Sequence, residues 1–85
     1  MGRAEEDPAY LNGRYLPLAE AQIPVLDRGF IFGDGVYEVI PVYQRKPFCL
    51  PEHLERLQNS LRDTQIHNPH TTSEWQQIIE RLCVE

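Results

Sequence analysis

Residues 36–61, VYEVIPVYQRKPFCLPEHLERLQNSL, decide the fold. The residues from Val36 to Tyr43 are mostly β-branched or aromatic, which favours a β-strand. Arg45-Lys46-Pro47 then predicts a turn, and a second strand is expected from Phe48 to Leu50. A helix is predicted to begin near Pro51, because proline suits the first helical turn. Its apolar stripe is formed by Leu54, Leu57 and Leu61.

The residues on either side extend this order of strands first and helices second. Asn12-Gly13 separates two short apolar segments, which is the strongest short-range signal for a two-residue hairpin turn. Thr71-x-x-Glu74 has the pattern of a helix capping box. The expected fold is therefore an α+β domain, residues 9–85, in which a small antiparallel sheet carries two helices on one side. Residues 1–8 are predicted to be a polar tail.

Composition and charge limit the partners of the chain. Its 85 residues suit a single domain, and a formal net charge of −5 gives no general attraction to nucleic acid or to an anionic membrane. No apolar run approaches the roughly 20 residues that span a bilayer. Cys49 and Cys83 are far apart and lie in no metal-binding or redox motif. The sequence predicts a cytoplasmic protein with reduced cysteines and no metal site.

The glycine-rich loop Gly33-Asp34-Gly35 precedes the predicted strand. A dinucleotide-binding fingerprint would need a third glycine at position 38 and a helix after it, but Glu38 and a strand follow, so that interpretation is excluded. Two interpretations remain. In the first, both glycines supply positive φ angles for a tight turn. In the second, the turn brings the backbone close to a ligand and directs the first strand residues into a cleft.

Side chains alternate along a strand, so Tyr37 and Glu38 are expected on opposite faces. Glu38 shares its face with Val36 and Ile40, and a carboxylate among apolar residues needs a cation or hydrogen-bond donors. Arg28 is one candidate partner. Tyr37 is either a half-buried aromatic residue whose hydroxyl reaches water or a donor to a bound carboxylate. Pro41 cannot donate to a strand ladder, so the strand is expected at an edge or with a bulge.

Arg56 lies on the predicted helix, away from its apolar stripe. One interpretation pairs it with Glu52, one turn earlier, as a solvent-exposed ion pair. The other uses its planar guanidinium as a two-pronged clamp for a phosphate or carboxylate. His53 is then either a second donor to the same anion or a structural residue beside the stripe.

These stretches together resemble a known family. DRGFIFGDGVYEVIPVY (27–43), followed by FCLPEHLERL (48–57), is similar to the N-terminal domain of the class IV pyridoxal-phosphate aminotransferases. The resemblance extends from Tyr10 over nearly the whole chain. Tyr37-Glu38-Val39 favours the D-amino acid aminotransferase branch over the branched-chain aminotransferases and the aminodeoxychorismate lyases, which usually continue this loop differently.

The resemblance implies roles for two residues. Arg56 matches the arginine that binds the phosphate of pyridoxal 5'-phosphate, and Tyr37 matches the tyrosine that helps hold the substrate α-carboxylate. The remaining carboxylate-binding groups of the family come from later sequence, in the other subunit of a homodimer. Pro41 departs from the usual residue of the branch, which concerns strand pairing and leaves these two roles unaffected.

The implied reaction is transfer of the amino group of D-alanine, or a similar D-amino acid, to a 2-oxo acid. It requires a lysine that forms a Schiff base with the cofactor. The single lysine, Lys46, lies in the predicted turn, where a solvent-exposed role is expected. The family places the catalytic lysine in a larger second domain, which this chain lacks, so the chain alone is predicted to be inactive.

A second hypothesis comes from a different functional class. The same fold could serve as a non-catalytic module for self-association or for binding a phosphorylated small molecule. The presence of both Tyr37 and Arg56 argues against it, because a pure interaction module needs neither residue.

Overall fold

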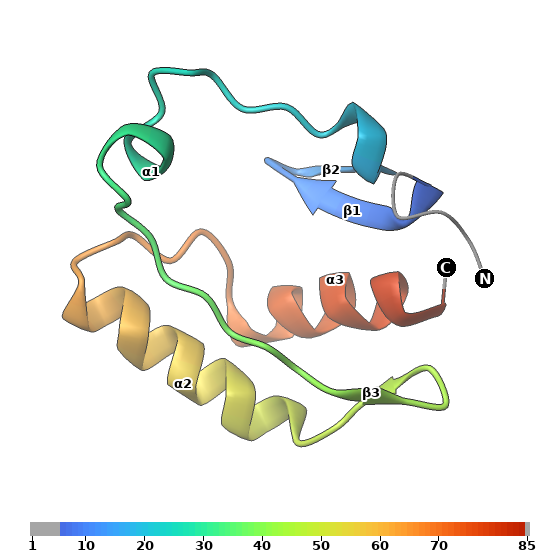
Figure 1. Ribbon diagram of the computed structural model, residues 1–85. Helices are drawn as coiled ribbons and strands as arrows, with labels where there is room; N and C mark the ends of the chain where they lie inside the picture. The colour runs from blue at the N-terminus through green and yellow to red at the C-terminus, as the bar shows by residue number, and fades with distance from the viewer. Residues whose placement is uncertain (1–5, 85) are drawn as a thin grey trace.

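The computed structural model describes residues 6–84, so most of the predicted tail lies outside the described residues. The elements follow the expected order of strands first and long helices last (Figure 1). They are β1 (Pro8–Leu11), β2 (Arg14–Pro17), the 3-10 helix η2 (Leu18–Glu20), α1 (Arg28–Ile31), β3 (Val42–Tyr43), β4 (Lys46–Pro47), α2 (Leu50–Asp63) and α3 (Thr72–Val84).

The first hairpin forms as the sequence predicts. β1 and β2 pair in antiparallel register, with Leu11 opposite Arg14. Asn12 and Gly13 make the turn at φ angles of 50° and 88°, the left-handed region that a two-residue hairpin turn requires and that asparagine and glycine tolerate. The prediction from Asn12-Gly13 is therefore confirmed.

The second hairpin is shorter and shifted from the expected position. β3 pairs with β4 so that Tyr43 lies opposite Lys46, and Gln44 and Arg45 make the turn at φ angles of 51° and 64°. The predicted turn at Arg45-Lys46-Pro47 was therefore one residue too late. The predicted strand from Phe48 to Leu50 was wrong, because Cys49 takes a left-handed φ of 54° and Leu50 already belongs to α2.

The expected strand from Val36 to Tyr43 is also reduced, to Val42–Tyr43. Residues 36–41 have no partner strand among the described residues, yet their side chains keep the alternation of a strand, as shown below. A backbone hydrogen bond joins the end of this segment to the residue after β4, since the Phe48 amide donates to the Pro41 carbonyl at 2.8 Å. Pro41 thus lies at a sheet edge, where a residue without an N–H is tolerated.

Both predicted long helices are confirmed. α2 begins one residue before Pro51 and buries Leu50, Leu54 and Leu61. α3 begins at Thr72 directly after a reciprocal capping box. In it the Glu74 amide donates to Thr71 Oγ1 at 3.1 Å, and the Thr71 amide donates to Glu74 Oε1 at 2.8 Å.

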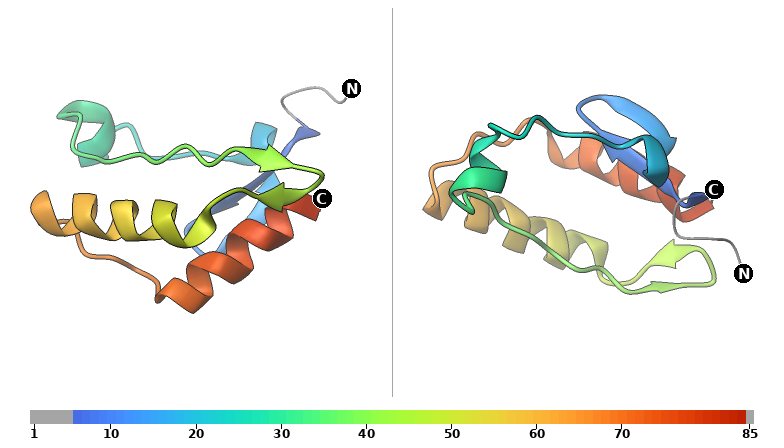
Figure 2. Two further views of the ribbon diagram at one scale, coloured as in Figure 1. Left: turned by 90° about the horizontal axis from the view of Figure 1, so that it is seen from below. Right: turned by 45° about the horizontal axis from the view of Figure 1, so that its top comes forward.

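The expected α+β fold of small antiparallel strands followed by two helices is confirmed, but the strands form two sheets rather than one. Each sheet has two strands. β1 and β4 both contact α3, and the chain from β2 to α1 passes above the helices before returning along α2 (Figures 1 and 2). The return segment contains residues 36–41.

Aromatic side chains fasten the first hairpin to α3. The His70 ring lies between the rings of Tyr10 and Trp75, at centroid distances of 5.8 Å and 4.8 Å. Trp75 Nε1 donates to Asn68 Oδ1 at 2.9 Å, and the Arg81 guanidinium stacks over Tyr15 at 3.7 Å. These edge and cation–π contacts explain how a hairpin with half-buried faces stays on the helix.

The hydrophobic core is small. Four hydrophobic residues of the described chain are buried, namely Leu50, Leu54, Leu61 and Ile78. The accessible surface is 7011 Å², whereas a compact monomer of this mass exposes about 5,200 Å². Many large hydrophobic side chains are in solvent, and several of them lie on α1 and the residues just before and after it.

Candidate functional site

The segment 36–41 runs along α2 (Figure 2). The side chains of this segment alternate between half-buried and exposed positions. Val36, Glu38 and Ile40 are half-buried, while Tyr37, Val39 and Pro41 are exposed. This is the alternation that the sequence predicts for a strand. It turns Glu38 toward α2 and Tyr37 away from it.

Glu38, on the extended segment, contacts two basic side chains of α2 and forms an ionic cluster with them. Its carboxylate oxygen Oε2 accepts a hydrogen bond from Nδ1 of His53 and lies 3.5 Å from Nη1 of Arg56. His53 and Arg56 are three residues apart on the helix, so their side chains emerge as neighbours. The Glu38 side chain is only 9% exposed, and a carboxylate buried to this degree needs such partners.

This cluster shows that the partners predicted for Glu38 and Arg56 were wrong. Arg28 does not pair with Glu38, because Arg28 Nε donates to Asp34 Oδ2 at 2.8 Å within the glycine-rich loop. Arg56 pairs with Glu38, and among the described ion pairs none joins it to Glu52. The alternation was read correctly from the sequence, but the cation came from α2.

The Arg56 guanidinium is suited to binding an anion. The Arg56 side chain is 69% exposed, and among the described residues the guanidinium has a single ion-pair partner, Glu38, which it meets through Nη1. Arginine presents five N–H donors in a planar fork that matches phosphate and carboxylate. Most of its donors therefore face solvent, and the guanidinium keeps the two-pronged geometry that the sequence suggested for a clamp.

Tyr37 lies apart from this cluster. The residue is 85% exposed, so the interpretation as a half-buried aromatic residue is wrong, and its phenol is open to a ligand or partner. Lys46 lies on β4 and is exposed. The structure thus brings Glu38, His53 and Arg56 together and leaves Tyr37 on the other face of the same segment.

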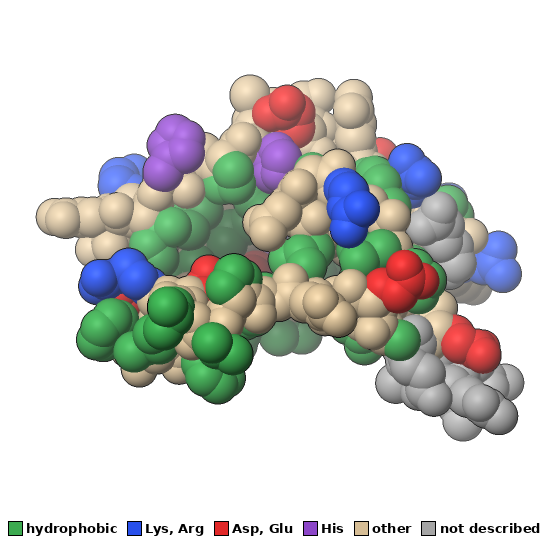
Figure 3. Space-filling model, turned by 90° about the horizontal axis from the view of Figure 1, so that it is seen from above, with side chains coloured by type: hydrophobic (Ala, Val, Ile, Leu, Met, Phe, Trp, Pro, Cys, Tyr) green, Lys and Arg blue, Asp and Glu red, His purple; other side chains and the backbone are tan. Residues whose placement is uncertain are grey.

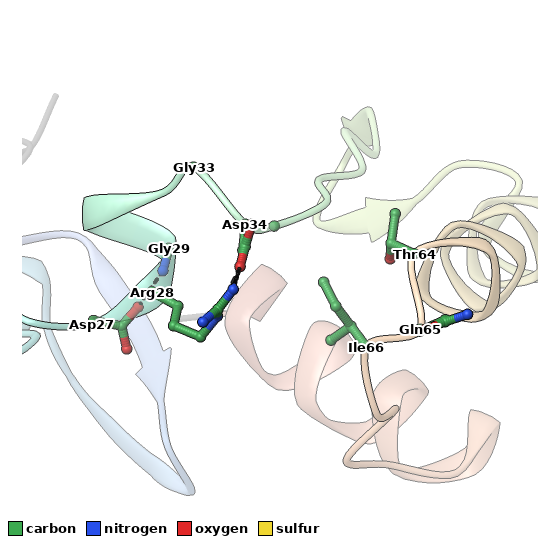
Figure 4. Close-up of a pocket in the computed structure, with 9 residues that line it drawn as sticks. Asp27, Arg28, Gly29, Gly33, Asp34, Thr64, Gln65 and Ile66 are labelled. Carbon is green, nitrogen blue, oxygen red and sulfur yellow. Dashed lines mark hydrogen bonds and ion pairs between the residues drawn. The ribbon is translucent and has the colours of Figure 1, made fainter.

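The glycine-rich loop borders a cavity of about 720 Å³. Figure 4 shows Asp27, Arg28 and Asp34 on one side of it and the α2–α3 connection, including Ile66, on the other. Gly33 has a positive φ of 68°, but Gly35 does not, so only one of the two glycines serves the turn as expected. Neither Tyr37 nor Arg56 lines this cavity.

The glycine at position 29 has a steric role in the same loop. A Cβ at Gly29 would lie 3.0 Å from Asp27 Oδ1 and 3.3 Å from the Asp34 carbonyl. The Gly29 amide donates to Asp27 Oδ1 at 2.8 Å, which caps α1. A side chain at position 29 would therefore force these neighbouring atoms to shift.

Exposed apolar side chains surround the loop. Figure 3 shows hydrophobic side chains lining the hollow on the upper face and gathering again along one edge. Near α1 the exposed hydrophobic residues include Val25, Leu26, Phe30, Ile31 and Phe32. Exposed hydrophobic residues that gather in one region are typical of an interaction surface.

Two further kinds of site were sought within residues 6–84. No group of three or more His, Cys, Asp or Glu side chains in that range is arranged to hold a metal ion. In the same range, no helix has the length and apolar character to cross a membrane.

Sequence reasoning left the roles of Glu38 and His53 open. The sequence contained a signal that could have connected them. A carboxylate on an apolar face needs a cation or hydrogen-bond donors, and the predicted helix carries two candidates three residues apart, His53 and Arg56. What the sequence did not contain was the position of the segment along the helix.

Comparison with known proteins shows which family the chain is similar to. Residues 35–85 match the family model described as amino-transferase class IV. The chain is 37% identical over 73 residues to an aminodeoxychorismate lyase of Bacillus subtilis (strain 168), covering 86% of the chain and 25% of that protein. It is 36% identical over 73 residues to a D-alanine aminotransferase of Staphylococcus haemolyticus, covering 86% of the chain and 26% of that protein.

A D-alanine aminotransferase of Staphylococcus epidermidis is 34% identical over 76 residues, which is 89% of the chain and 27% of that protein. The chain thus spans about a quarter of the length of the curated relatives that it matches. The matched region contains the extended segment, Glu38 and the α2 cluster. The chain therefore belongs to the class IV aminotransferase family.

Proposed function

We propose that this chain is the N-terminal domain of a pyridoxal-phosphate-dependent D-amino acid aminotransferase. In the complete enzyme, D-alanine or a similar D-amino acid gives its amino group to a 2-oxo acid such as 2-oxoglutarate. The observation that carries the proposal is the exposed Arg56 guanidinium, fixed at one nitrogen by Glu38 and open at the others. The similarity to D-alanine aminotransferases of two Staphylococcus species also supports this branch.

In this proposal Arg56 binds the cofactor and Tyr37 binds the substrate. Arg56 holds the phosphate of pyridoxal 5'-phosphate through paired N–H donors. Tyr37 donates its phenol to the α-carboxylate of the substrate. The cofactor, when bound, supplies the electron sink and carries the amino group between the two substrates. The contribution of this chain is binding and orientation.

The chain alone is proposed to be inactive. A lysine that joins the cofactor must be partly desolvated so that its amine is uncharged and nucleophilic. Lys46 is exposed in a two-residue strand, a setting that does not desolvate its amine. We propose that the complete enzyme supplies this lysine from a larger second domain and works as a homodimer.

The test begins with the reading frame beyond Glu85. The full-length protein is purified, incubated with pyridoxal 5'-phosphate, and given D-alanine or L-alanine, each with and without 2-oxoglutarate. The proposal predicts sustained formation of pyruvate from D-alanine only when 2-oxoglutarate is present, because without an acceptor the amino group stays on the enzyme and the reaction stops after one equivalent per active site. Pyruvate from L-alanine alone would place the protein elsewhere in the family, and no turnover of either amino acid would refute the proposed substrate.

An aminodeoxychorismate lyase is the second candidate, because the Bacillus subtilis relative of that name is as similar as the aminotransferases. A lyase cleaves its substrate without an amino acceptor. Turnover of aminodeoxychorismate that is independent of any 2-oxo acid would therefore favour it. A branched-chain aminotransferase would instead consume L-leucine with 2-oxoglutarate.

The non-catalytic module is favoured by one observation, the large exposed apolar surface around α1. It predicts a stable dimer of the natural protein that turns over none of these substrates. Turnover of any of these substrates by the purified full-length protein would count against it.

A further inference from the structure

Glu38 differs from the other acidic residues within 6–84, all of which are exposed, in being largely covered by protein. Its side chain is 9% exposed and that of His53 is 14% exposed, whereas that of Arg56 is 69% exposed. The described side chains contain no buried polar atom without a hydrogen-bond partner. Glu38 and His53 therefore form a satisfied, largely buried pair from which Arg56 extends into solvent.

The buried pair also anchors the backbone that carries it. Residues 36–41 have no partner strand among the described residues, so a regular hydrogen-bond ladder does not hold this segment in place. The side-chain contacts of Glu38 tie the segment to α2 near its middle. Breaking one partner of a buried ionic contact is costly because the other charge is left uncompensated.

Arg56 would be poorly oriented without this contact. An arginine side chain has many rotamers, and fixing them on binding weakens affinity unless they are already restricted. Glu38 Oε2 holds Nη1 of Arg56 at 3.5 Å and leaves the rest of the guanidinium exposed. His53 in turn fixes the same oxygen from the buried side.

We propose that Glu38, held by His53, is a positioning residue that orients the Arg56 guanidinium for the phosphate of the cofactor. The inference rests on the proposed role of Arg56. Two effects of Glu38 have opposite signs, since its negative charge repels a nearby phosphate while its contact restricts Arg56. The proposal commits to the second as the larger effect, because Glu38 is shielded behind His53 and Arg56 faces solvent.

The size of the effect follows from the cost of immobilising one side chain. That cost corresponds to roughly a 2- to 12-fold change in a binding constant. The substitution Glu38→Gln keeps the shape of the side chain and an acceptor oxygen for His53, but removes the ion pair with Arg56. It is expected to weaken binding of pyridoxal phosphate about fivefold.

The test uses the full-length protein in its apo form and titrates it separately with pyridoxal phosphate and with pyridoxal, which lacks the phosphate. Binding is followed by the absorbance of the bound chromophore. The variants are E38Q, R56Q and the double variant E38Q/R56Q. E55Q is the matched control, because Glu55 is exposed on the same helix and has no ion pair among the described residues.

The expected pattern is specific to the phosphate. R56Q and E38Q are each expected to weaken the binding of pyridoxal phosphate and to leave the dissociation constant of pyridoxal within twofold of the wild-type value. E55Q is expected to change the binding of neither ligand. In the R56Q background, E38Q adds less than a twofold change, because Glu38 acts through Arg56. Should E38Q lower expression, His53→Asn replaces it, with His67→Asn as control at an exposed histidine.

The outcomes separate the two proposals. If R56Q shows no phosphate-specific loss, the assigned role of Arg56 fails and this inference fails with it. If R56Q shows the loss and E38Q does not, or if E38Q tightens phosphate binding, only the positioning role is overturned. An equal loss for both ligands in E38Q would show a general structural role and would also overturn it.

Discussion

Removal of the Thr71 hydroxyl gives a direct test of the capping box that starts α3. In the wild type, the Glu74 amide donates to Thr71 Oγ1 at 3.1 Å and the Thr71 amide donates to Glu74 Oε1 at 2.8 Å. The substitution Thr71→Ala removes the first bond and keeps the second. Glu74→Gln keeps an acceptor oxygen at the second and removes its charge.

The expected cost of Thr71→Ala is about 1 kcal/mol, the usual value for loss of a threonine N-cap. In a domain of this size, about 1 kcal/mol lowers the melting temperature by roughly 4–8 °C. α3 contacts both β1 and β4, so fraying of its first turn loosens Trp75 and the aromatic contacts that hold the hairpin. The loss is therefore expected in the global transition and not only in helix content.

The two variants differ in their dependence on pH. The hydrogen bond from the Thr71 amide, with help from the Thr71 hydroxyl and nearby His70, holds the pKa of Glu74 below its usual value near 4.5. A carboxyl whose pKa is lowered by folding stabilises the fold above the unfolded pKa. That stabilisation is lost as the pH falls through the lower, folded pKa.

Thermal unfolding followed by circular dichroism at pH 7 and at pH 3 measures both effects. Thr71→Ala should lower the melting temperature at both pH values, because a hydroxyl does not titrate. Glu74→Gln should lower it at pH 7 and much less at pH 3, with Glu55→Gln as a control that changes little. An equal loss for Glu74→Gln at both pH values, or no loss for Thr71→Ala, would refute this account of the helix start.

Three further predictions concern the core, the thiol and the exposed surface. Leu54→Ala should lower the free energy of unfolding by about 2–5 kcal/mol in urea titrations, because Leu54 is 6% exposed; Leu18→Ala, at 46% exposure, should cost much less. Desolvation and the Glu52 carboxylate raise the pKa of the Cys49 thiol, so iodoacetamide should alkylate it at pH 8 more slowly than free cysteine, and Glu52→Gln should speed the reaction. Phe30→Ser should weaken self-association of the chain in sedimentation velocity by about tenfold or more if that surface joins two copies, since burying a phenylalanine contributes about 1.5–3 kcal/mol; an unchanged dimerisation constant would exclude Phe30 from the contact.

Local signals in the sequence predicted the elements that depend on local contacts. Asn12-Gly13 predicted the first hairpin because its turn needs φ angles that few residues adopt. Thr71-x-x-Glu74 predicted the start of α3 because both hydrogen bonds of the box lie within four residues. The apolar stripe of α2 was predicted for the same reason, since helical periodicity is a local property.

The elements that depend on distant contacts were predicted less well. Gln44 and Arg45 form the second turn although neither is a typical turn residue, so the pairing of β3 with β4 decides the conformation there. The alternation of residues 36–41 was correct, but the partner of Glu38 was not. Arg28 lies nearer in sequence than His53, yet it is held by Asp34 in its own loop.

The contacts of Glu38 also bear on the proposed role of Tyr37. Consecutive side chains of an extended segment point to opposite faces, so tying Glu38 to α2 directs Tyr37 away from the helix. An 85% exposed phenol cannot by itself fix the position of a small carboxylate, because a binding site for a small molecule needs walls that exclude water. In the proposed enzyme these walls come from residues beyond the described chain, which covers about a quarter of its relatives. In this proposal the contact of Glu38 with α2 has two effects. It orients Arg56 for the cofactor phosphate, and it fixes the segment so that Tyr37 points away from the helix and toward the substrate.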